Sequence, residues 1–213
     1  MTNQNFNMVD KLISEFDHAL RVINGKVTTN TPSPEKKIGV DKLILSDKSK
    51  SAKLMRVNHS GEISAQALYR GQAFFARTRE QRNQLLAAAD DENNHLAWCK
   101  ERVNQLDGNT SIFTPIWYGG SFILGITAGL AGDKVSLGFI AETERQVAKH
   151  LANHLDKLPK SDQKSYEILK KMRTDEIRHG SEAEKKGTID PPKYIKNLMA
   201  KMAKIMTTVS YHL

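Results

Sequence analysis

Three Glu-x-x-His pairs stand out in the sequence, because their spacing can bind a metal ion. They are Glu15/His18, Glu92/His95 and Glu176/His179. Side chains three residues apart on an α-helix lie one turn apart on the same face, so a carboxylate oxygen and an imidazole nitrogen can reach one ion together. The chain therefore holds three candidate half-sites for a metal.

A lone glutamate precedes two of these pairs at nearly the same distance. Glu62 lies 30 residues before Glu92, and Glu144 lies 32 residues before Glu176. Nothing comparable precedes Glu15, so we interpret Glu15 and His18 as a surface pair. The repeat predicts one site with four carboxylates and two imidazoles. Its candidate metal ligands are Glu62, Glu92, His95, Glu144, Glu176 and His179.

The two repeated pairs lie on apolar helical stripes rather than on charged faces. One stripe is Leu85, Ala88, Glu92, His95, Cys99 and Val103, and the other is Leu169, Met172, Glu176, His179 and Ala183. A carboxylate on a core-facing stripe costs free energy unless a cation or another partner compensates its charge. Two such stripes facing each other therefore predict a compensating charge in the core.

The third long helix offers two glutamates, Glu142 and Glu144. A stripe of Leu137, Ile140, Val147 and Leu151 shares its face with Glu144. Glu142, two residues away, is expected to face outward.

Two questions stay open at this point. A plain helical bundle could let its glutamates and histidines satisfy one another without metal, although the repeated order favours the dimetal bundle. Asp91 and Asp175 each precede a candidate ligand. Either aspartate could orient a ligand histidine through a hydrogen bond or could simply be a solvated acid.

The elements that must position these residues all read as helices, which predicts an all-α fold. Apolar spacing predicts a short N-terminal helix over 5–24, four long helices and a basic amphipathic C-terminal helix. The long helices are expected at 51–76, 79–105, 135–158 and 161–186, with Pro159 ending the third and Ser161 capping the fourth. Residues 1–50 are thus an N-terminal helix and linker, and residues 51–213 a four-helix bundle.

Two segments favour contact with a membrane surface. Residues 108–132 contain no charged side chain before Asp133, but Pro115 and several glycines disfavour a spanning helix, so we expect a re-entrant or surface-dipping segment. Residues 193–211 place Ile195, Leu198, Met202, Ile205 and Val209 on one stripe, with lysines mostly off it. Both segments predict a peripheral membrane protein.

Composition limits the class of protein and its partners. The formal charge of +8 favours an anionic partner, but the lysines are not interleaved with aromatic residues as in a nucleic-acid-binding module, so no nucleic acid is expected. The single cysteine excludes an intramolecular disulfide and indicates a reducing compartment. The N-terminus shows no secretory signal.

The sequence resembles the Coq7 family, the demethoxyubiquinone hydroxylases of ubiquinone biosynthesis, from about Met55 to Leu213. The resemblance rests on "MRVNHSGEISAQALYRGQ", "DDENNHLAWC", "SLGFIAETERQVAKHL" and "RTDEIRH". It implies a ferritin-like di-iron monooxygenase whose iron ligands are the six residues named above, with Glu92 and Glu176 bridging. One departure is Leu151, where some members carry a tyrosine, so an electron relay through that tyrosine is in doubt for this chain.

The resemblance also implies cofactors, partners and a location. Two Fe ions per chain would use O2 to hydroxylate the ring of a polyprenylated demethoxy-quinol, with NADH or another donor as the reductant. The enzyme would lie on anionic lipid at the cytoplasmic face of the cell membrane, or at the inner mitochondrial membrane in a eukaryote. Other ubiquinone-biosynthesis proteins are candidate partners.

Two other functions compete with this hypothesis. A ferritin-like ferroxidase or peroxidase would share the site, but it would leave the apolar segment at 108–132 unexplained. A metal-free lipid-binding scaffold of a quinone-synthesis complex would bind no iron, so counting bound metal separates it from the enzyme.

Overall fold

The computed structural model describes residues 8–25, 29 and 31–213, and its regular elements are all helical, as predicted. The first residues of the N-terminal helix expected at 5–24 lie outside the described part. The helices are α1 (Met8–Ile23), α2 (Leu45–Phe74), α3 (Arg79–Gln105), α4 (Thr114–Leu130), α5 (Asp133–Lys157), α6 (Gln163–Lys185) and α7 (Lys193–His212), with one 3-10 turn, η1 (Pro34–Lys37).

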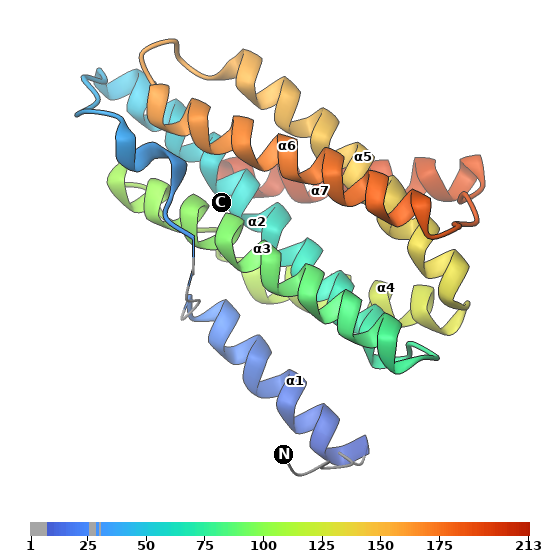
Figure 1. The fold of residues 1–213 in the computed structure, drawn as a ribbon. Helices are drawn as coiled ribbons and strands as arrows, with labels where there is room; N and C mark the ends of the chain where they lie inside the picture. Colours follow the sequence, from blue (N-terminus) through green and yellow to red (C-terminus); the bar gives the residue numbers. More distant parts are fainter. Residues whose placement is uncertain (1–7, 26–28, 30) are drawn as a thin grey trace.

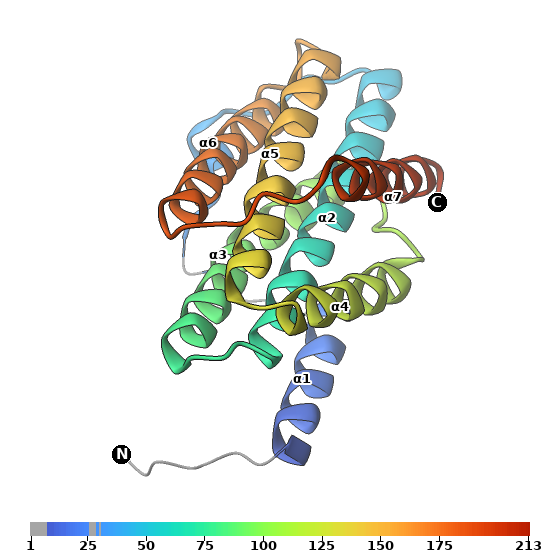
Figure 2. The ribbon, with the colours of Figure 1, turned by 90° about the vertical axis from the view of Figure 1, so that its right-hand side faces the viewer.

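The four long helices α2, α3, α5 and α6 form the ferritin-like bundle (Figure 1). α2 packs against α3, and α5 packs against α6. The two remaining helices of the body, α4 and α7, cross the bundle on the side away from α3 and α6 (Figure 2). The bundle therefore has one side formed by α3 and α6 and another covered by α4 and α7.

The ends of two long helices differ from the sequence prediction. α2 begins at Leu45 rather than at Ser51. The cap of α6 is Asp162, whose carboxylate accepts a hydrogen bond from the Ser165 backbone N–H. The prediction that Ser161 caps this helix is wrong, because its hydroxyl donates to the carboxylate of Asp47 instead.

Part of the predicted linker packs on the bundle through one buried arginine. The Arg102 guanidinium donates to the carboxylate of Asp162 at 2.6 Å and to the Ser165 hydroxyl at 2.9 Å, and it also pairs with Asp41 ahead of α2. Glu35 of η1 is buried and accepts a hydrogen bond from Gln105 of α3. These contacts fasten the segment before α2 to α3 and α6.

α1 turns polar side chains toward the bundle. Glu15 is buried, and its carboxylate accepts hydrogen bonds from the Arg70 guanidinium at 2.7 and 2.9 Å. His18 lies 3.3 Å from the side-chain oxygen of Gln66, and burial together with the charge of Arg70 lowers the pKa of His18 to about 4. The interpretation of Glu15 and His18 as a surface pair is therefore wrong, because both side chains contact α2.

The opposite side of α1 is apolar and faces outward. Its exposed large side chains are Met8, Val9, Leu12, Ile13, Phe16 and Leu20. A surface helix ordinarily buries such a stripe, whereas on α1 it lies exposed.

Two of the apolar clusters in the core of the described chain differ in character. The large-residue cluster includes Met55, Trp98, Cys99, Leu151, Leu169 and Met172. The alanine cluster is built from Tyr69, Ala73, Leu85, Ala89, Ile140, Ala141 and Ala183. The bulk of the core is therefore unevenly distributed along the bundle axis.

The uncharged segment 108–132 contributes α4, which packs mainly on α2. The two helices approach closely at Gly71 and Gly125, where a Cβ on Gly125 would overlap the backbone oxygen of Leu68. None of the described helices combines the length and the apolar character that crossing a membrane requires.

This crossing generates a prediction about stability. Gly125→Ala should lower the free energy of unfolding by about 1–3 kcal/mol, because the new methyl group forces α4 away from α2. Gly120→Ala, also in α4, is the matched control, since a Cβ there meets no atom within 4 Å. The control should be neutral or stabilising by up to about 1 kcal/mol. Urea unfolding of both variants measures the difference, and equal stability would contradict the close crossing.

Candidate metal centre

The six side chains singled out by spacing meet in the centre of the bundle. They come from α2 (Glu62), α3 (Glu92 and His95), α5 (Glu144) and α6 (Glu176 and His179), and all six are buried. Their donor atoms form two groups, within each of which the atoms lie no more than 4.8 Å apart. One group is Glu62, Glu92, His95 and Glu176, and the other is Glu92, Glu144, Glu176 and His179. Glu92 and Glu176 therefore belong to both groups.

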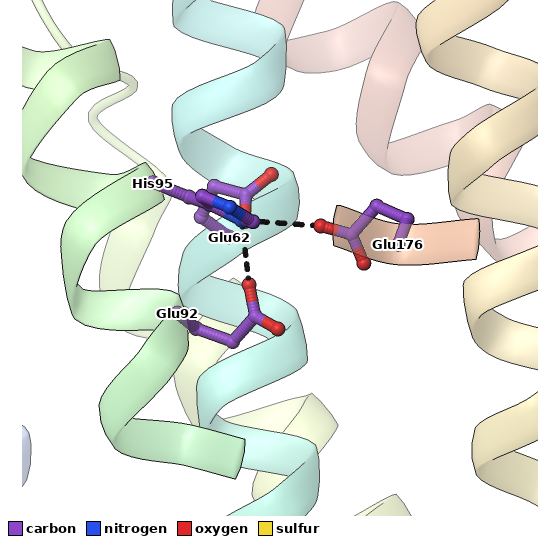
Figure 3. Close-up of side chains that lie close together, drawn as sticks. All are labelled: Glu62, Glu92, His95 and Glu176. Atoms are coloured by element: carbon purple, nitrogen blue, oxygen red, sulfur yellow. Dashed lines mark hydrogen bonds and ion pairs between the residues drawn. The ribbon is translucent and has the colours of Figure 1, made fainter. Parts of the chain in front are cut away.

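The first group surrounds one nitrogen of His95 (Figure 3). The Nδ1 atom lies 3.0 Å from a Glu92 oxygen, 3.1 Å from a Glu176 oxygen and 3.4 Å from a Glu62 oxygen. The helical period explains the convergence, because Glu92 and His95 share one face of α3 while α2 and α6 supply the other two carboxylates. Three carboxylates thus face a single imidazole nitrogen.

The second group contains donor atoms that lack a protein partner. Nδ1 of His179 points to Glu92, with 3.4 Å between the nitrogen and the nearest carboxylate oxygen. Both carboxylate oxygens of Glu144 are buried, and neither finds a hydrogen-bond partner within the described chain. A buried carboxylate without a partner costs several kcal/mol by order of magnitude, so a cation would compensate it.

The cluster shifts the proton affinities of its own members. Burial raises the pKa of Glu62 well above its ordinary value, and it does the same to Glu144, with the charge of Glu176 adding to both effects. Burial acts in the same direction on Glu92, but the imidazoles of His179 and His95 outweigh it and hold the pKa of Glu92 well below the usual range. Some of these carboxylates therefore favour a proton unless a metal cation supplies the positive charge.

These residues fit metal ions by type as well as by position. Four carboxylates and two imidazoles suit iron or manganese, whereas structural zinc sites are four-coordinate and rich in sulfur or nitrogen. Two overlapping groups that share two carboxylates could hold two ions side by side. The donor set thus fits a dimetal centre.

The two aspartates that precede the pairs differ in their contacts. Asp175 Oδ2 lies 3.1 Å from Nε2 of His95, on the outer edge of the ring. Burial acts to raise the pKa of Asp175, but the His95 hydrogen bond and Lys171 lower it to about 2. Asp91 is exposed and lies 3.7 Å from Nε2 of His179, beyond hydrogen-bond distance. Asp175 alone of the two makes the orienting hydrogen bond.

Sequence reasoning did not single out Lys171 and Arg178, which lie at the outer edges of the two imidazoles. Lys171 Nζ donates to Asp175 at 2.6 Å, and an Arg178 nitrogen lies 3.1 Å from Nε2 of His179. A cavity of about 170 Å³ opens here between α3 and α6. The four-residue spacing from Lys171 to Asp175 is that of a helical ion pair and was the available signal.

Glu142 lies apart from the centre but not in solvent. Its carboxylate pairs with Arg145, accepts a hydrogen bond from Gln146 at 2.7 Å and lies 3.7 Å from Lys196 of α7. The expectation that Glu142 faces outward is wrong, because α7 packs over this part of α5 and the glutamate is buried.

Comparison with known proteins gives a consistent family. Residues 49–210 match the family model described as "Ubiquinone biosynthesis protein COQ7". A relative from Herbaspirillum seropedicae is 48% identical over 205 residues, which cover 96% of this chain and 99% of that protein. A relative from Ralstonia pickettii is 46% identical over 217 residues, covering 97% and 100%. One from Legionella pneumophila is 48% identical over 209 residues, covering 97% and 98%.

All three relatives carry the name 3-demethoxyubiquinol 3-hydroxylase. The match extends over the helices that bring the candidate ligands together, which confirms the resemblance seen in the sequence motifs. The chain therefore belongs to the COQ7 family of ubiquinone biosynthesis proteins.

Proposed function

We propose that this protein is a di-iron monooxygenase that hydroxylates the ring of a polyprenylated 3-demethoxyubiquinol. The observation that carries the proposal is the pair of overlapping donor groups sharing Glu92 and Glu176. The names of nearly full-length relatives support the substrate. In such a reaction one oxygen atom of O2 enters the ring, and the other leaves as water after uptake of two electrons and two protons.

The six buried side chains would each have a role as metal ligands. Glu92 and Glu176 would bridge two ions, Glu62 and His95 would complete one coordination sphere, and Glu144 and His179 the other. When bound, two ferrous ions supply the electrons that activate O2. The carboxylates would keep the centre electron-rich, and the hydrogen bond that His95 Nε2 donates to Asp175 would fix the orientation of the His95 ring.

The surrounding core would keep bulk water from the reacting atoms. Met172, Leu169 and Cys99 are fully buried, and each lies on a helical stripe with a candidate ligand. Burial raises the pKa of the Cys99 thiol well above its ordinary value, so the thiol stays protonated beside the carboxylates. A dry interior strengthens the electrostatic interactions of the site.

We also propose that the protein docks on a membrane surface to reach its substrate, because a polyprenyl quinol dissolves in the bilayer rather than in water. α4 exposes Ile116, Ile123 and Leu130, and Ile112 is exposed in the loop just before it. α7 exposes Tyr194, Leu198, Met202 and Ile205. Exposed lysines at 193, 201 and 204 flank the row on α7 and would meet anionic headgroups. In a bacterium this surface would be the cytoplasmic face of the cell membrane.

These exposed rows also bear on the competing functions. A ferroxidase or peroxidase acts on small water-soluble substrates and gives no reason for apolar rows on α4 and α7. A metal-free scaffold would explain the rows but not the partnerless carboxylate of Glu144. The hydroxylase accounts for both observations.

Isotope labelling tests the reaction. Protein loaded anaerobically with Fe(II) should convert a short-chain demethoxy-quinol into a product that carries one atom of ¹⁸O from ¹⁸O2 and none from H2¹⁸O, as measured by mass spectrometry. Protein without iron is the control and should form no product. Label from water, or iron oxidation without ring hydroxylation, would overturn the proposal in favour of hydrolytic or ferroxidase chemistry.

Metal counting tests the shared carboxylates. Wild-type protein should bind two irons per chain, and Glu176→Ala should lose both, because that carboxylate belongs to both groups. Glu62→Ala should weaken mainly one site. Glu142→Gln is the control and should keep two irons, since its carboxylate pairs with Arg145 outside the centre. Retention of two irons by Glu176→Ala would refute the bridging role.

Vesicle binding tests the docking surface. Affinity should rise with the fraction of anionic lipid and fall with salt. Replacing Lys201 and Lys204 by glutamine should weaken binding roughly tenfold to thirtyfold, since each lysine near the surface contributes about 1 kcal/mol. The same change at Lys185 and Lys186, exposed at the end of α6, is the matched control. Equal binding to neutral and anionic vesicles would exclude docking through the lysines of α7.

A further inference from the structure

Tyr69 of α2 is a buried polar residue that the proposed metal chemistry leaves unused. Its side chain is 2% exposed, and its hydroxyl has no hydrogen-bond partner within the part of the chain that the structure describes. A phenol in a protein core ordinarily finds a partner, because an unpaired hydroxyl loses its bonds to water without replacement. A phenylalanine would fill the same space without that cost.

The helical period places Tyr69 on the same side of α2 as Glu62, seven residues earlier. Seven residues are about two turns, a rise of about 10 Å along the axis. Side chains of a helix lean toward its N-terminus, so the Tyr69 ring leans toward Glu62 and the metal centre.

The neighbours of Tyr69 place its side chain in the layer of core next to the centre. It packs in the alanine cluster, whose members Ala89, Ala141 and Ala183 come from the three other long helices. Ala89 lies three residues before Glu92, Ala141 three before Glu144 and Ala183 four after His179. The cluster therefore forms the layer of core next to the candidate ligands.

The two layers beside the centre differ in bulk. Met172, Leu169 and Leu151 fill the layer on the side of the large-residue cluster. On the side of Tyr69 the corresponding positions are mostly alanine, and Gly180 packs against the Cβ of Glu144. The flat ring of a quinol substrate would enter the core more easily beside alanines, because fewer heavy atoms would have to move.

We propose that the quinol ring binds on the alanine-cluster side of the centre and that the Tyr69 hydroxyl donates a hydrogen bond to a ring oxygen of the quinol. Tyr69 would be a substrate-positioning residue that sets which ring carbon faces the metal. This inference rests on the proposed hydroxylase function and adds to it the position of the substrate ring.

Tyr69→Phe separates this role from a structural one. The metal-free variant should unfold at the same temperature as wild type or about 2–4 °C higher, because an unpaired buried hydroxyl is removed. KM for a short-chain demethoxy-quinol should rise roughly threefold to tenfold, the loss expected for one hydrogen bond. Ubiquinone with a short prenyl tail should bind the metal-free variant more weakly by a similar factor, measured by calorimetry.

Tyr118→Phe is the matched control. Its hydroxyl is also buried without a partner among the described residues, but Tyr118 belongs to α4 and packs against Val22, Ile63 and Leu96 rather than in the alanine cluster. This variant should show the same thermal behaviour with unchanged KM and unchanged binding of the short-chain ubiquinone.

The outcomes distinguish failure of the inference from failure of the proposed function. If wild type hydroxylates the quinol and Tyr69→Phe shows unchanged KM and quinone binding, the inference is wrong and the function stands. A lower unfolding temperature with unchanged KM would assign the hydroxyl a structural role and overturn the inference too. If iron-loaded wild type neither binds nor hydroxylates the quinol, the proposed function is wrong, and the inference that rests on it is wrong as well.

Discussion

The structure depends on the burial of four carboxylates and two imidazoles at the centre of one bundle. Carboxylates removed from water repel one another strongly unless protons or a cation compensate their charge. Each long helix contributes at least one of these groups, so the requirement for compensation acts on all four helices at once. Glu92 and Glu176 face each other from α3 and α6 and couple the two halves of the repeat, because both donor groups need them.

The rest of the fold can be understood as the surroundings that this centre requires. Large side chains close one end of it and alanines line the other. On the α3–α6 side, Asp175 and Lys171 hold the outer edge of His95. α4 and α7 lie on the other side and carry exposed apolar rows (Figure 2). A bundle with one polar side and one apolar side suits an enzyme that takes its organic substrate from lipid.

Helical period explains how much of this could be predicted from sequence. The spacing of Glu92, His95, Glu176 and His179 on apolar stripes predicted that they meet in the core, because a stripe on a long helix has only one inward face. The same argument selected Glu144 over Glu142. The ligand roles of these residues stay predictions, whereas their convergence is a feature of the fold.

Contacts between distant segments account for what the sequence did not reveal. Glu142 is buried because α7 returns across α5, and Glu15 is buried because Arg70 of α2 meets it. Ser161 was a reasonable cap by residue type, but Asp162 also pairs with Arg102 and takes that position. Each of these errors concerns a polar residue whose partner lies far away along the chain.

X-ray diffraction from iron-loaded crystals, collected on both sides of the iron absorption edge, can locate the metal directly. We expect two anomalous peaks per chain inside the bundle, both in contact with Glu92 and Glu176, one also with His95 and the other with His179. A single peak, or iron bound only outside these two groups, would contradict a dimetal centre that shares these carboxylates.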